Sequence, residues 1–302
     1  MSAMEPQVNV VIVTYNSLNV IGGLLDSLPA ALEGLIYDVV IVDNGSTDGT
    51  AEFVDARGGC RVVRSVNDGY AGGINRGVRE AVPAEAILIA NPDVRLRNRS
   101  VRPLLAALRE GNVGIVAPQV RSPLGTLEFS LRREPTLLRA LGLTGTGLAV
   151  FSEYVTKPAD YARPHIVDWA LGAVLLISRK CHEMMDGWDE SYFLYSEETD
   201  LCLRARDKGL LTRYEPRSVA VHIGGQSGRD RRTHAMQIVN RMRLYRRRHG
   251  ALASWCYYWL VIASELSWLA RGHRQSGSAI AAMLWPSRRP RALGCCDRLM
   301  PE

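Results

Sequence analysis

Short apolar segments alternate with segments of helical periodicity at the start of this chain, and this alternation restricts the fold more than any other feature. The apolar segments are continuous, which is typical of parallel strands buried on both faces. The predicted strands are 8–13, 37–42, 61–65 and 86–90, and the predicted helical segments are 19–32, 51–56 and, after a glycine-rich loop, 67–81. This order predicts an α/β fold, a parallel sheet with helices on both sides.

The pattern changes after a further predicted helix at 104–109. Three later segments predict strands that make the sheet a mixed one, and they are 114–120, 167–178 and 211–222. From residue 233 onward the chain is predicted to be helical. The 302 residues can form one large domain with an added helical part. We therefore predict an α/β domain over 1–228 and a helical C-terminal extension over 229–302 with a flexible tail.

Composition restricts the possible binding partners and the cellular compartment less strongly than the alternation of strands and helices restricts the fold. A net charge of +6 is compatible with anionic partners such as nucleotides or phospholipid headgroups and selects none of them. The N-terminus shows no signal-peptide pattern, which predicts a cytoplasmic protein. No two cysteines stand at zinc-binding spacing, so we expect reduced thiols, with Cys295 and Cys296 in the flexible tail.

The second predicted strand leads directly into Asp43-Asn44-Gly45-Ser46-Thr47-Asp48-Gly49-Thr50. One interpretation is a simple strand-to-helix turn, in which Ser46 or Thr47 caps the helix. The other adds a function, because open α/β sheets bind ligands at the carboxyl ends of their strands. There, Asp43 could accept a hydrogen bond from the imide N–H of a uracil or thymine ring.

A glycine-rich cluster follows the third predicted strand, at residues 67–77. Small residues allow a backbone to approach a ligand closely, and the N-terminus of the following helix favours phosphate. The cluster is neither a P-loop nor a dinucleotide-binding motif, which disfavours an NTPase and a dehydrogenase.

Two later strand ends carry candidate metal ligands. Asn91-Pro92-Asp93 follows the fourth predicted strand, where a carboxylate could hold a divalent cation, although a simple turn explains the same residues. His222 ends the last predicted strand. Since a carboxylate and an imidazole together suit Mn²⁺ better than Ca²⁺, we expect Asp93 and His222 to share a metal ion.

The densest polar cluster is 187–204, where carboxylates stand among aromatic residues. Glu197, Glu198 and Asp200 open a predicted helix, a placement that the helix dipole favours by itself. Carboxylates beside apolar side chains also tend to have raised pKa values, which suits a general base. We expect a catalytic role for this cluster.

The order of these motifs resembles the family 2 glycosyltransferases, and in particular their bacterial rhamnosyltransferase branch. The resemblance covers residues 8–249 and rests on the ordered set Val-Ile-Val-Thr-Tyr-Asn, Asp-Asn-Gly-Ser-Thr-Asp-Gly-Thr, Asn-x-Gly-Tyr-Ala-Gly-Gly-Ile-Asn-Arg-Gly, Asn-Pro-Asp-Val, Gly-Ala, Tyr-x-Glu-Glu-Thr-Asp-Leu-Cys-Leu-Arg and His-x-x-Gly-x-Ser. It implies a GT-A fold, an inverting displacement, a dTDP- or UDP-activated donor, and Mg²⁺ or Mn²⁺. The best guess for the sugar is L-rhamnose, while galactofuranose, glucose and GlcNAc donors stay open.

The resemblance also implies roles for individual residues. Asn91-Pro92-Asp93 takes the place of the family's Asp-x-Asp motif, so that Asp93 alone carries its metal contact. Glu198 stands where the family has its catalytic base, and Glu197 is the alternative. The implied nucleotide-binding residues are Thr14, Tyr15, Asn16, Asp43, Asn75 and Asp93, and those of the acceptor side are Trp188, Asp200, Arg241, Arg243 and Arg247.

Residues 229–249 are rich in arginine, and the apolar segment 251–270 follows them directly. The segment has nearly the length of a membrane span, but Glu265 and several serines and aromatic residues favour a helix that lies in the membrane interface. Packing on the catalytic domain or on a second subunit of a homodimer explains it equally well. A peripheral position at the inner face of the cell membrane would suit a polyprenyl-diphosphate-linked glycan acceptor, as this branch often uses.

Three other functions were weighed. A sugar-phosphate nucleotidyltransferase would need a lysine near the N-terminus, and this chain has none before Lys157. A non-catalytic nucleotide- or glycan-binding protein with a decayed site is the main alternative, suggested by Asn91 and Glu198 and opposed by Asp93, Glu197 and Asp200. Nucleic-acid binding is not expected, because no known binding module surrounds the arginines.

Overall fold

The computed structural model describes residues 6–224, 230–290 and 299. The strands are β1 (Val8–Thr14), β2 (Tyr37–Asp43), β3 (Arg61–Arg64), β4 (Ala86–Ala90), β5 (Val94–Leu96), β6 (Val113–Arg121), β7 (Leu131–Arg132), β8 (His165–Val167), β9 (Trp169–Ala170), β10 (Val174–Ser178) and β11 (Leu211–His222). The α-helices are α1 (Leu18–Ala31), α2 (Thr50–Arg57), α3 (Tyr70–Glu80), α4 (Val101–Leu108), α5 (Leu137–Ala140), α6 (Arg179–Met184), α7 (Glu197–Asp207), α8 (Arg231–Arg248), α9 (Ala251–Ala270) and α10 (Gln275–Leu284).

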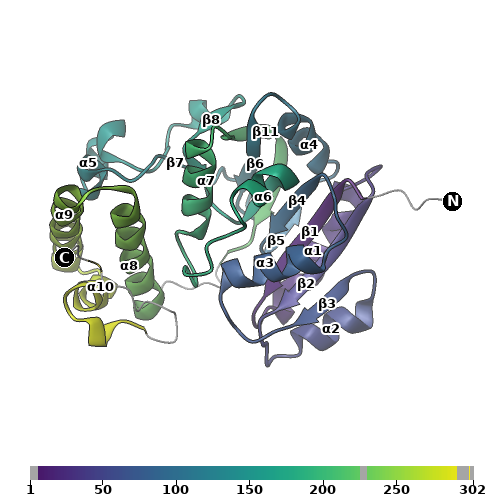
Figure 1. The fold of residues 1–302 in the computed structure, drawn as a ribbon, viewed down its shortest axis with the longest axis horizontal. Helices are drawn as coiled ribbons and strands as arrows, with labels where there is room; N and C mark the ends of the chain where they lie inside the picture. Colours follow the sequence, from purple (N-terminus) through teal and green to yellow (C-terminus); the bar gives the residue numbers. More distant parts are fainter. Residues whose placement is uncertain (1–5, 225–229, 291–298, 300–302) are drawn as a thin grey trace.

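The main sheet has the strand order β3-β2-β1-β4-β10-β6-β11-β5, and β8 pairs with β11 beside this path. The first four strands are parallel to one another, as the alternation of strands and helices predicts. β10 then runs antiparallel to β4 and to β6, while β6 and β11 are parallel. The predicted α/β fold with a mixed sheet between helices is confirmed (Figure 1).

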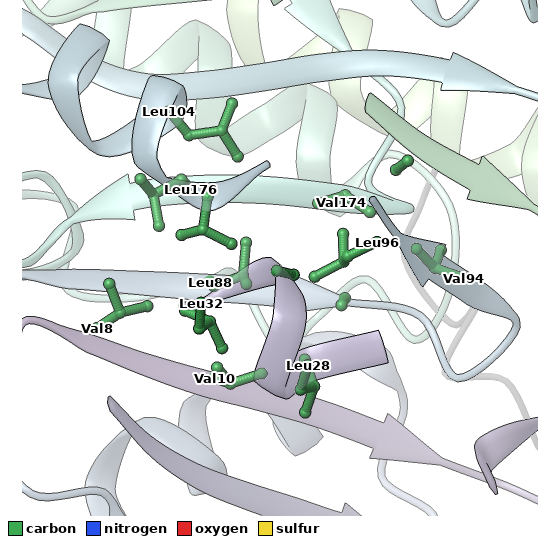
Figure 2. Close-up of a cluster of buried hydrophobic side chains, with 14 of the residues drawn as sticks. Val8, Val10, Leu28, Leu32, Leu88, Val94, Leu96, Leu104, Val174 and Leu176 are labelled. Atoms are coloured by element: carbon green, nitrogen blue, oxygen red, sulfur yellow. The ribbon is translucent and has the colours of Figure 1, made fainter. Parts of the chain in front are cut away.

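The strands at the centre of the sheet, such as β1, β4 and β10, are mainly apolar because both faces of the sheet are covered. In β1, Val8, Val10 and Ile12 point toward α1 and α4, whereas Val11 and Val13 point toward α3 on the other face. Figure 2 shows the first of these cores, in which side chains from α1, α4, β1, β4, β5 and β10 meet. Because every second residue serves a different core, no position in β1 is left for a polar surface.

Glycines allow α3 to lie close to the sheet. A Cβ atom on Gly73 would lie 2.7 Å from a methyl carbon of Val13, and one on Gly77 would lie 2.5 Å from a methyl carbon of Val11. These two glycines of the glycine-rich cluster therefore serve helix-to-strand packing. At the start of the same helix, the N–H of Tyr70 donates to the carbonyl of Phe193 at 2.8 Å.

The prediction of one continuous strand over 167–178 was wrong. The structure divides this segment into three strands. The end of β8 pairs with β11, β9 pairs with β7, and β10 pairs with both β4 and β6. A turn at Gly172 and Ala173 separates β9 from β10. Strands as short as β5 and β7 carry too few residues for a periodicity, and the sequence patterns did not predict them.

Helices α8, α9 and α10 form a separate group beside the sheet, at the left of Figure 1. They share a hydrophobic core that also includes Ala140 of α5 and Leu137, so a segment from the middle of the chain packs into the C-terminal helices. Helical structure was predicted for this region, and the division of the chain at residue 228 stays a prediction. None of the helices in the described part of the chain is long and apolar enough to cross a membrane.

Candidate active site

The carboxyl ends of the parallel strands bring the first polar residues together. Thr14 ends β1 and stands beside Asp43, which ends the neighbouring β2. The Thr14 hydroxyl donates to Asp43 Oδ1 at 2.9 Å, and the N–H of Ser46 donates to Asp43 Oδ2 at the same distance. Ser46 therefore binds Asp43 and does not cap α2. The carboxylate is buried and already ties the two loops together.

Asn16 connects the same two loops from the other side. Its backbone has a left-handed conformation, with φ of 50°, and its N–H donates to the Ser46 hydroxyl at 2.8 Å. Its side-chain oxygen accepts the N–H of Thr47 at 2.8 Å. Tyr15 is more than half exposed beside this junction. The roles of Thr14, Tyr15, Asn16 and Asp43 in nucleotide binding stay predictions, but the structure does place these residues together.

Asn75 of α3 has a clear structural use. Its amide nitrogen donates to the carbonyl of Trp188 at 2.8 Å, and its amide oxygen accepts the Trp188 N–H at 2.9 Å. Gly187 allows this contact, since a Cβ atom there would lie 2.7 Å from the Asn75 oxygen. The buried amide is thus occupied by the loop before α7, and this geometry does not support the expected contact with nucleotide or ribose.

Two adjacent carboxylates are enclosed at the start of α7. Burial raises the pKa of Glu197 well above its usual value, and the neighbouring Glu198 raises it further. Burial also raises the pKa of Glu198, but backbone hydrogen bonds, including one from Gly172, and the charge of Arg132 oppose that shift. One oxygen of each carboxyl is buried without a hydrogen-bond partner among the described residues. Of the two, Glu198 is the more readily ionised.

The turn that presents these glutamates has an unusual backbone. Tyr195 and Ser196 both have left-handed conformations, with φ of 68° and 76°. Such conformations disfavour residues other than glycine and persist only where the surroundings hold them. Asn240 of α8 does so, because its amide nitrogen donates to the carbonyls of Leu194 and Tyr195 at 2.9 and 3.2 Å.

Tyr70 lies between the parts of the site, a role that the sequence analysis did not assign. Its hydroxyl donates to Asn91 Oδ1 at 2.6 Å. Burial raises the pKa of Tyr70 well above its usual value, and the carboxylates of Glu197, Glu198 and Asp93 raise it further. The phenol therefore stays protonated, and it is close enough to all three carboxylates to feel their charge.

Asp93 and His222 meet as predicted for a shared metal ion. β11 pairs with β5 so that His222 lies opposite Val94, and His222 Nε2 is 3.3 Å from Asp93 Oδ2. The hydrogen bond to Asp93 raises the pKa of His222. The other ring nitrogen, Nδ1, lies 3.5 Å from a carboxylate oxygen of Glu128. Metal-binding histidines usually have such a carboxylate on the second nitrogen, although no pattern around Glu128 indicated it.

The described residues contain no group of three or more histidine, cysteine, aspartate or glutamate side chains that could hold a metal ion by themselves. A carboxylate and an imidazole still fit Mg²⁺ or Mn²⁺, because such ions commonly complete their coordination with substrate phosphates and water. Gly225, Gln226 and Ser227, which belong to the His-x-x-Gly-x-Ser motif, lie outside the described residues.

Asp200 and Trp188 are both buried beside the start of α7, and their role in an acceptor pocket stays a prediction. Asp200 Oδ2 accepts a hydrogen bond from Arg204 Nε at 2.6 Å, and the same guanidinium donates to the carbonyls of Met185 and Gly187. This pair holds the loop before α7, so Asp200 is not available as a base. Trp188 is buried, and its indole N–H has no hydrogen-bond partner among the described residues.

The arginines predicted for the acceptor are mostly used inside the protein. Arg243 is buried and donates to the carbonyl of Ser191 at 3.0 Å, and Arg241 binds Glu153 and the Tyr257 hydroxyl. These internal contacts do not support a pairing of Arg241 and Arg243 with acceptor phosphates, which stays a prediction. Arg247 forms an ion pair with Asp189 at 2.6 Å. The helical spacing of these arginines gave no sign of their partners, which come from distant segments.

Arg132 is a further residue without a predicted role. Its guanidinium lies 4.1 Å from the centre of the Tyr154 ring and donates to the carbonyl of Leu131 at 2.9 Å. Burial lowers the pKa of Arg132, and the charge of Glu198 is among the effects that oppose this shift. A cation is thus placed near the glutamate pair.

Comparisons with known proteins agree with this geometry. A model of glycosyl transferase family 2 matches residues 9–154. The N-acetylglucosaminyl-diphospho-decaprenol L-rhamnosyltransferase of Mycobacterium tuberculosis is 32% identical over 247 residues, which cover 74% of this chain and 79% of that protein. The chain belongs to glycosyl transferase family 2.

Further relatives of this family-2 glycosyltransferase are more distant. The low-salt glycan biosynthesis hexosyltransferase Agl10 of Haloferax volcanii is 28% identical, over 68% of this chain and 64% of that protein. A mannosyltransferase from Pyrobaculum calidifontis, solved with GDP-Man and Mn²⁺, superposes with a TM-score of 0.57 at 17% identity, covering 97% of this chain and 84% of the other. The likeness in structure confirms the predicted GT-A fold.

Proposed function

We propose that this glycosyltransferase transfers a sugar, most simply L-rhamnose, from a dTDP- or UDP-activated donor to a glycan linked to a lipid diphosphate. The name of the mycobacterial relative supports both the sugar and the class of acceptor. The observation that carries the proposal is the adjacent pair Glu197–Glu198, in which each carboxyl has one buried oxygen without a hydrogen-bond partner among the described residues.

Glu198 acts as the base in this proposal. Its ionised carboxylate takes the proton of an acceptor hydroxyl while that oxygen forms a bond to the anomeric carbon and the bond to the diphosphate breaks. Arg132 and the backbone of Gly172 favour the ionised form of Glu198. Burial and the charge of Glu198 raise the pKa of Glu197 well above its usual value, against one backbone hydrogen bond that lowers it, and Glu197 is the protonated member of the pair in this proposal. These differences support Glu198 over Glu197 as the base.

Asp93 and His222 are proposed to hold Mg²⁺ or Mn²⁺, with Glu128 orienting the imidazole of His222. When bound, the cation would offset the charge that develops on the leaving diphosphate. Asp43 and Asn16 would hold the nucleoside at the other end of the donor. Asp43 ends β2 and Asp93 follows β4, and these strands flank the parallel β1, so the donor would extend along the carboxyl ends of β2, β1 and β4.

The first experiment is binding of dTDP, UDP and GDP by calorimetry, each with and without Mn²⁺. We expect metal-dependent binding of dTDP or UDP that is lost in Asp93→Ala and kept in Glu198→Gln. Turnover should fall by about a thousandfold in Glu198→Gln, because general-base catalysis contributes about 10²–10⁴-fold. The matched control is Glu52→Gln, a change at an exposed glutamate of α2.

Three results would count against the proposal. If no nucleoside diphosphate binds, the roles of Asp43 and Asp93 are wrong, and a decayed binding site becomes the better explanation. If Glu197→Gln abolishes turnover and Glu198→Gln does not, the two glutamates have exchanged roles. Turnover that survives removal of all divalent cations would refute the metal site.

A further inference from the structure

Asn91 directly follows β4 and lies two residues before Asp93, the proposed metal ligand. Its N–H donates to the carbonyl of Ala173 at 2.9 Å, and its carbonyl accepts the N–H of Val94 at 3.1 Å. Since both backbone groups are used, the side chain is the part of Asn91 that can contact a ligand. An asparagine here stands in place of the first acid of the family's Asp-x-Asp motif, and this replacement is one of the two reasons to consider a decayed site.

The hydroxyl of Tyr70 fixes the orientation of the Asn91 side chain. The hydroxyl oxygen lies 2.6 Å from Asn91 Oδ1 and 3.4 Å from the carbonyl oxygen of Gly172. A phenol has one proton to donate, and only the shorter distance is that of a normal O–H···O hydrogen bond. In a reversed amide, Nδ2 would take the place of Oδ1 and leave the phenol proton with the distant carbonyl alone. The acceptor is therefore Oδ1.

Tyr70 is held well enough to impose this orientation. Its N–H donates to the carbonyl of Phe193 at 2.8 Å, and its ring lies edge-on to that of Trp188, with the ring centres 6.4 Å apart. The preceding Gly69 allows this close approach, because a Cβ atom on it would lie 2.5 Å from the Phe193 carbonyl oxygen. The start of α3 thus connects the loop before α7 with the end of β4.

With its oxygen occupied, Asn91 has only its amide nitrogen to offer to a ligand. Nδ2 makes no hydrogen bond with any described residue. It is also accessible, because the side chain is half-buried and Nδ2 is not one of the enclosed polar atoms of the described chain that lack a partner. An amide nitrogen carries two protons and donates both, so it suits an oxygen of a ligand and not a metal ion.

The charges around Tyr70 explain why an uncharged side chain suits position 91. Besides burial, the carboxylates of Glu197, Glu198 and Asp93 raise the pKa of Tyr70, so all three lie near its hydroxyl. An acid at position 91 could accept the same phenol proton, but it would add a negative charge beside Asp93. That charge would repel a diphosphate, whereas an amide N–H forms a strong hydrogen bond to an anionic oxygen.

We propose that Asn91 binds the donor substrate: its amide nitrogen donates a hydrogen bond to a diphosphate oxygen of the nucleotide sugar, and Tyr70 holds the amide in the orientation that allows it. Asn91 then contacts the substrate, while Tyr70 is a positioning residue that acts through Asn91. The inference rests on the proposed function and deepens it. The change from an acid to an amide is a change of role, and it does not indicate a decayed site.

The test is calorimetry of dTDP and UDP with Mn²⁺. Asn91→Ala should weaken the binding about tenfold to a hundredfold, because it removes a hydrogen bond to a charged group. Asn98→Ala, at an exposed asparagine beyond β5, is the matched control and should bind as the wild type does. Equal binding by Asn91→Ala and the wild type would overturn the inference.

Tyr70→Phe tests the positioning role, since it keeps the ring against Trp188 and removes only the hydroxyl. It should weaken binding about threefold to tenfold, because the amide can then rotate. In the Asn91→Ala background the same change should cost less than about twofold, since the group that Tyr70 orients is gone. An equal effect of Tyr70→Phe in both backgrounds would refute a role that acts through Asn91.

Asn91→Asp separates a hydrogen-bond donor from a decayed metal ligand. We expect weaker binding of the nucleoside diphosphate and lower turnover than in the wild type, because a like charge replaces the donor. Tighter binding or faster turnover than in the wild type would overturn the inference and identify position 91 as a lost metal ligand. If Asn91→Ala weakened the binding of dTDP-rhamnose and left dTDP and UDP unchanged, the assignment to the diphosphate would be wrong.

The wild type and the variants answer different questions. Binding of a nucleoside diphosphate by the wild type tests the proposed function, and its absence would refute both the function and this inference. Binding by the wild type that Asn91→Ala retains in full would refute this inference alone. Thermal unfolding of each variant shows whether it folds, and the three Asn91 and Asn98 variants decide the question even if Tyr70→Phe does not.

Discussion

At the scale of single residues, the site depends on small differences between neighbours. Glu197 and Glu198 are adjacent in sequence, yet Glu198 has more backbone donors than Glu197 and a nearby guanidinium to support its charge. Two identical side chains thereby acquire different protonation states, which is how enzymes commonly divide the roles of two carboxyl groups. Their surroundings, and not their chemical type, decide which one can act as a base.

The raised pKa of Glu197 makes a prediction about stability. The folded state favours the protonated carboxyl, so this contribution to the free energy of unfolding is fully present below the unfolded pKa of about 4.3 and is lost as the pH rises through the raised pKa. In Glu197→Gln we expect this loss to disappear, so that its Tm exceeds that of the wild type at alkaline pH and matches it near pH 4. Thermal unfolding across the pH range checks this, and an unchanged pH dependence in the variant would contradict it.

Gly172 leads to a second prediction at this scale. A Cβ atom at this position would lie 3.3 Å from the Cβ of Glu198, which is closer than most real contacts, and its backbone angles are not restricted to glycine. Gly172→Ala should therefore displace Glu198 and lower kcat about tenfold, because catalytic geometry tolerates little displacement. Calorimetry should show unchanged binding of the nucleoside diphosphate. Gly250→Ala, where nothing lies within 4 Å of the new Cβ, should leave kcat as it is.

At the scale of elements, α8 supports the turn that carries the glutamates. Asn240 binds two consecutive carbonyls of the strained turn, and Arg243 binds both the Asn240 side chain and the carbonyl of Ser191. The helix belongs to the C-terminal group, while the turn leads into α7 beside the sheet. Through α8, the C-terminal extension thus holds the turn that carries the two glutamates.

Asn240 is accordingly predicted to be a positioning residue. Asn240→Ala removes both hydrogen bonds to the turn and should destabilise the protein by about 1–3 kcal/mol, since buried carbonyls lose their partner. It should also lower kcat while leaving the KM for the donor nearly unchanged. Urea unfolding and steady-state kinetics measure the two effects. Asn112→Ala loses one exposed hydrogen bond to Gly209 far from the site and serves as the control; an equal loss of kcat there would refute a specific role for Asn240.

At the scale of the whole molecule, one buried cluster joins the C-terminal helices to the middle of the chain. Arg241 of α8 contacts both the carboxylate of Glu153 and the Tyr257 hydroxyl of α9. The residue after Glu153 is Tyr154, whose ring lies beside the guanidinium of Arg132. The same contacts hold residues 153 and 154 in place. Through this cluster, the C-terminal helices and the surroundings of Glu198 share a connected framework.

Arg241→Met tests this connection. The substitution leaves Glu153 without its cation in a mostly buried position and should destabilise the protein by about 3 kcal/mol, as for other broken buried ion pairs. The double variant Arg241→Met/Glu153→Gln should recover part of the loss, because it removes the uncompensated charge. Denaturant unfolding of the single and double variants measures the difference. A double variant that is less stable than the single one would contradict the interpretation.

The sequence alone determined the α/β fold, the order of its principal strands and helices, the family, and the meeting of Asp93 with His222. These follow from continuous apolar strands, whose carboxyl ends gather at one edge of a sheet, and from motifs that are local in the chain. Only the tertiary structure decided which polar groups are already occupied. The partners of Asn75, Asp200, Arg241 and Arg243 come from loops and helices whose positions no local pattern contains. The backbone donors and the guanidinium of Arg132 that distinguish Glu198 from Glu197 are likewise brought there by the packed molecule.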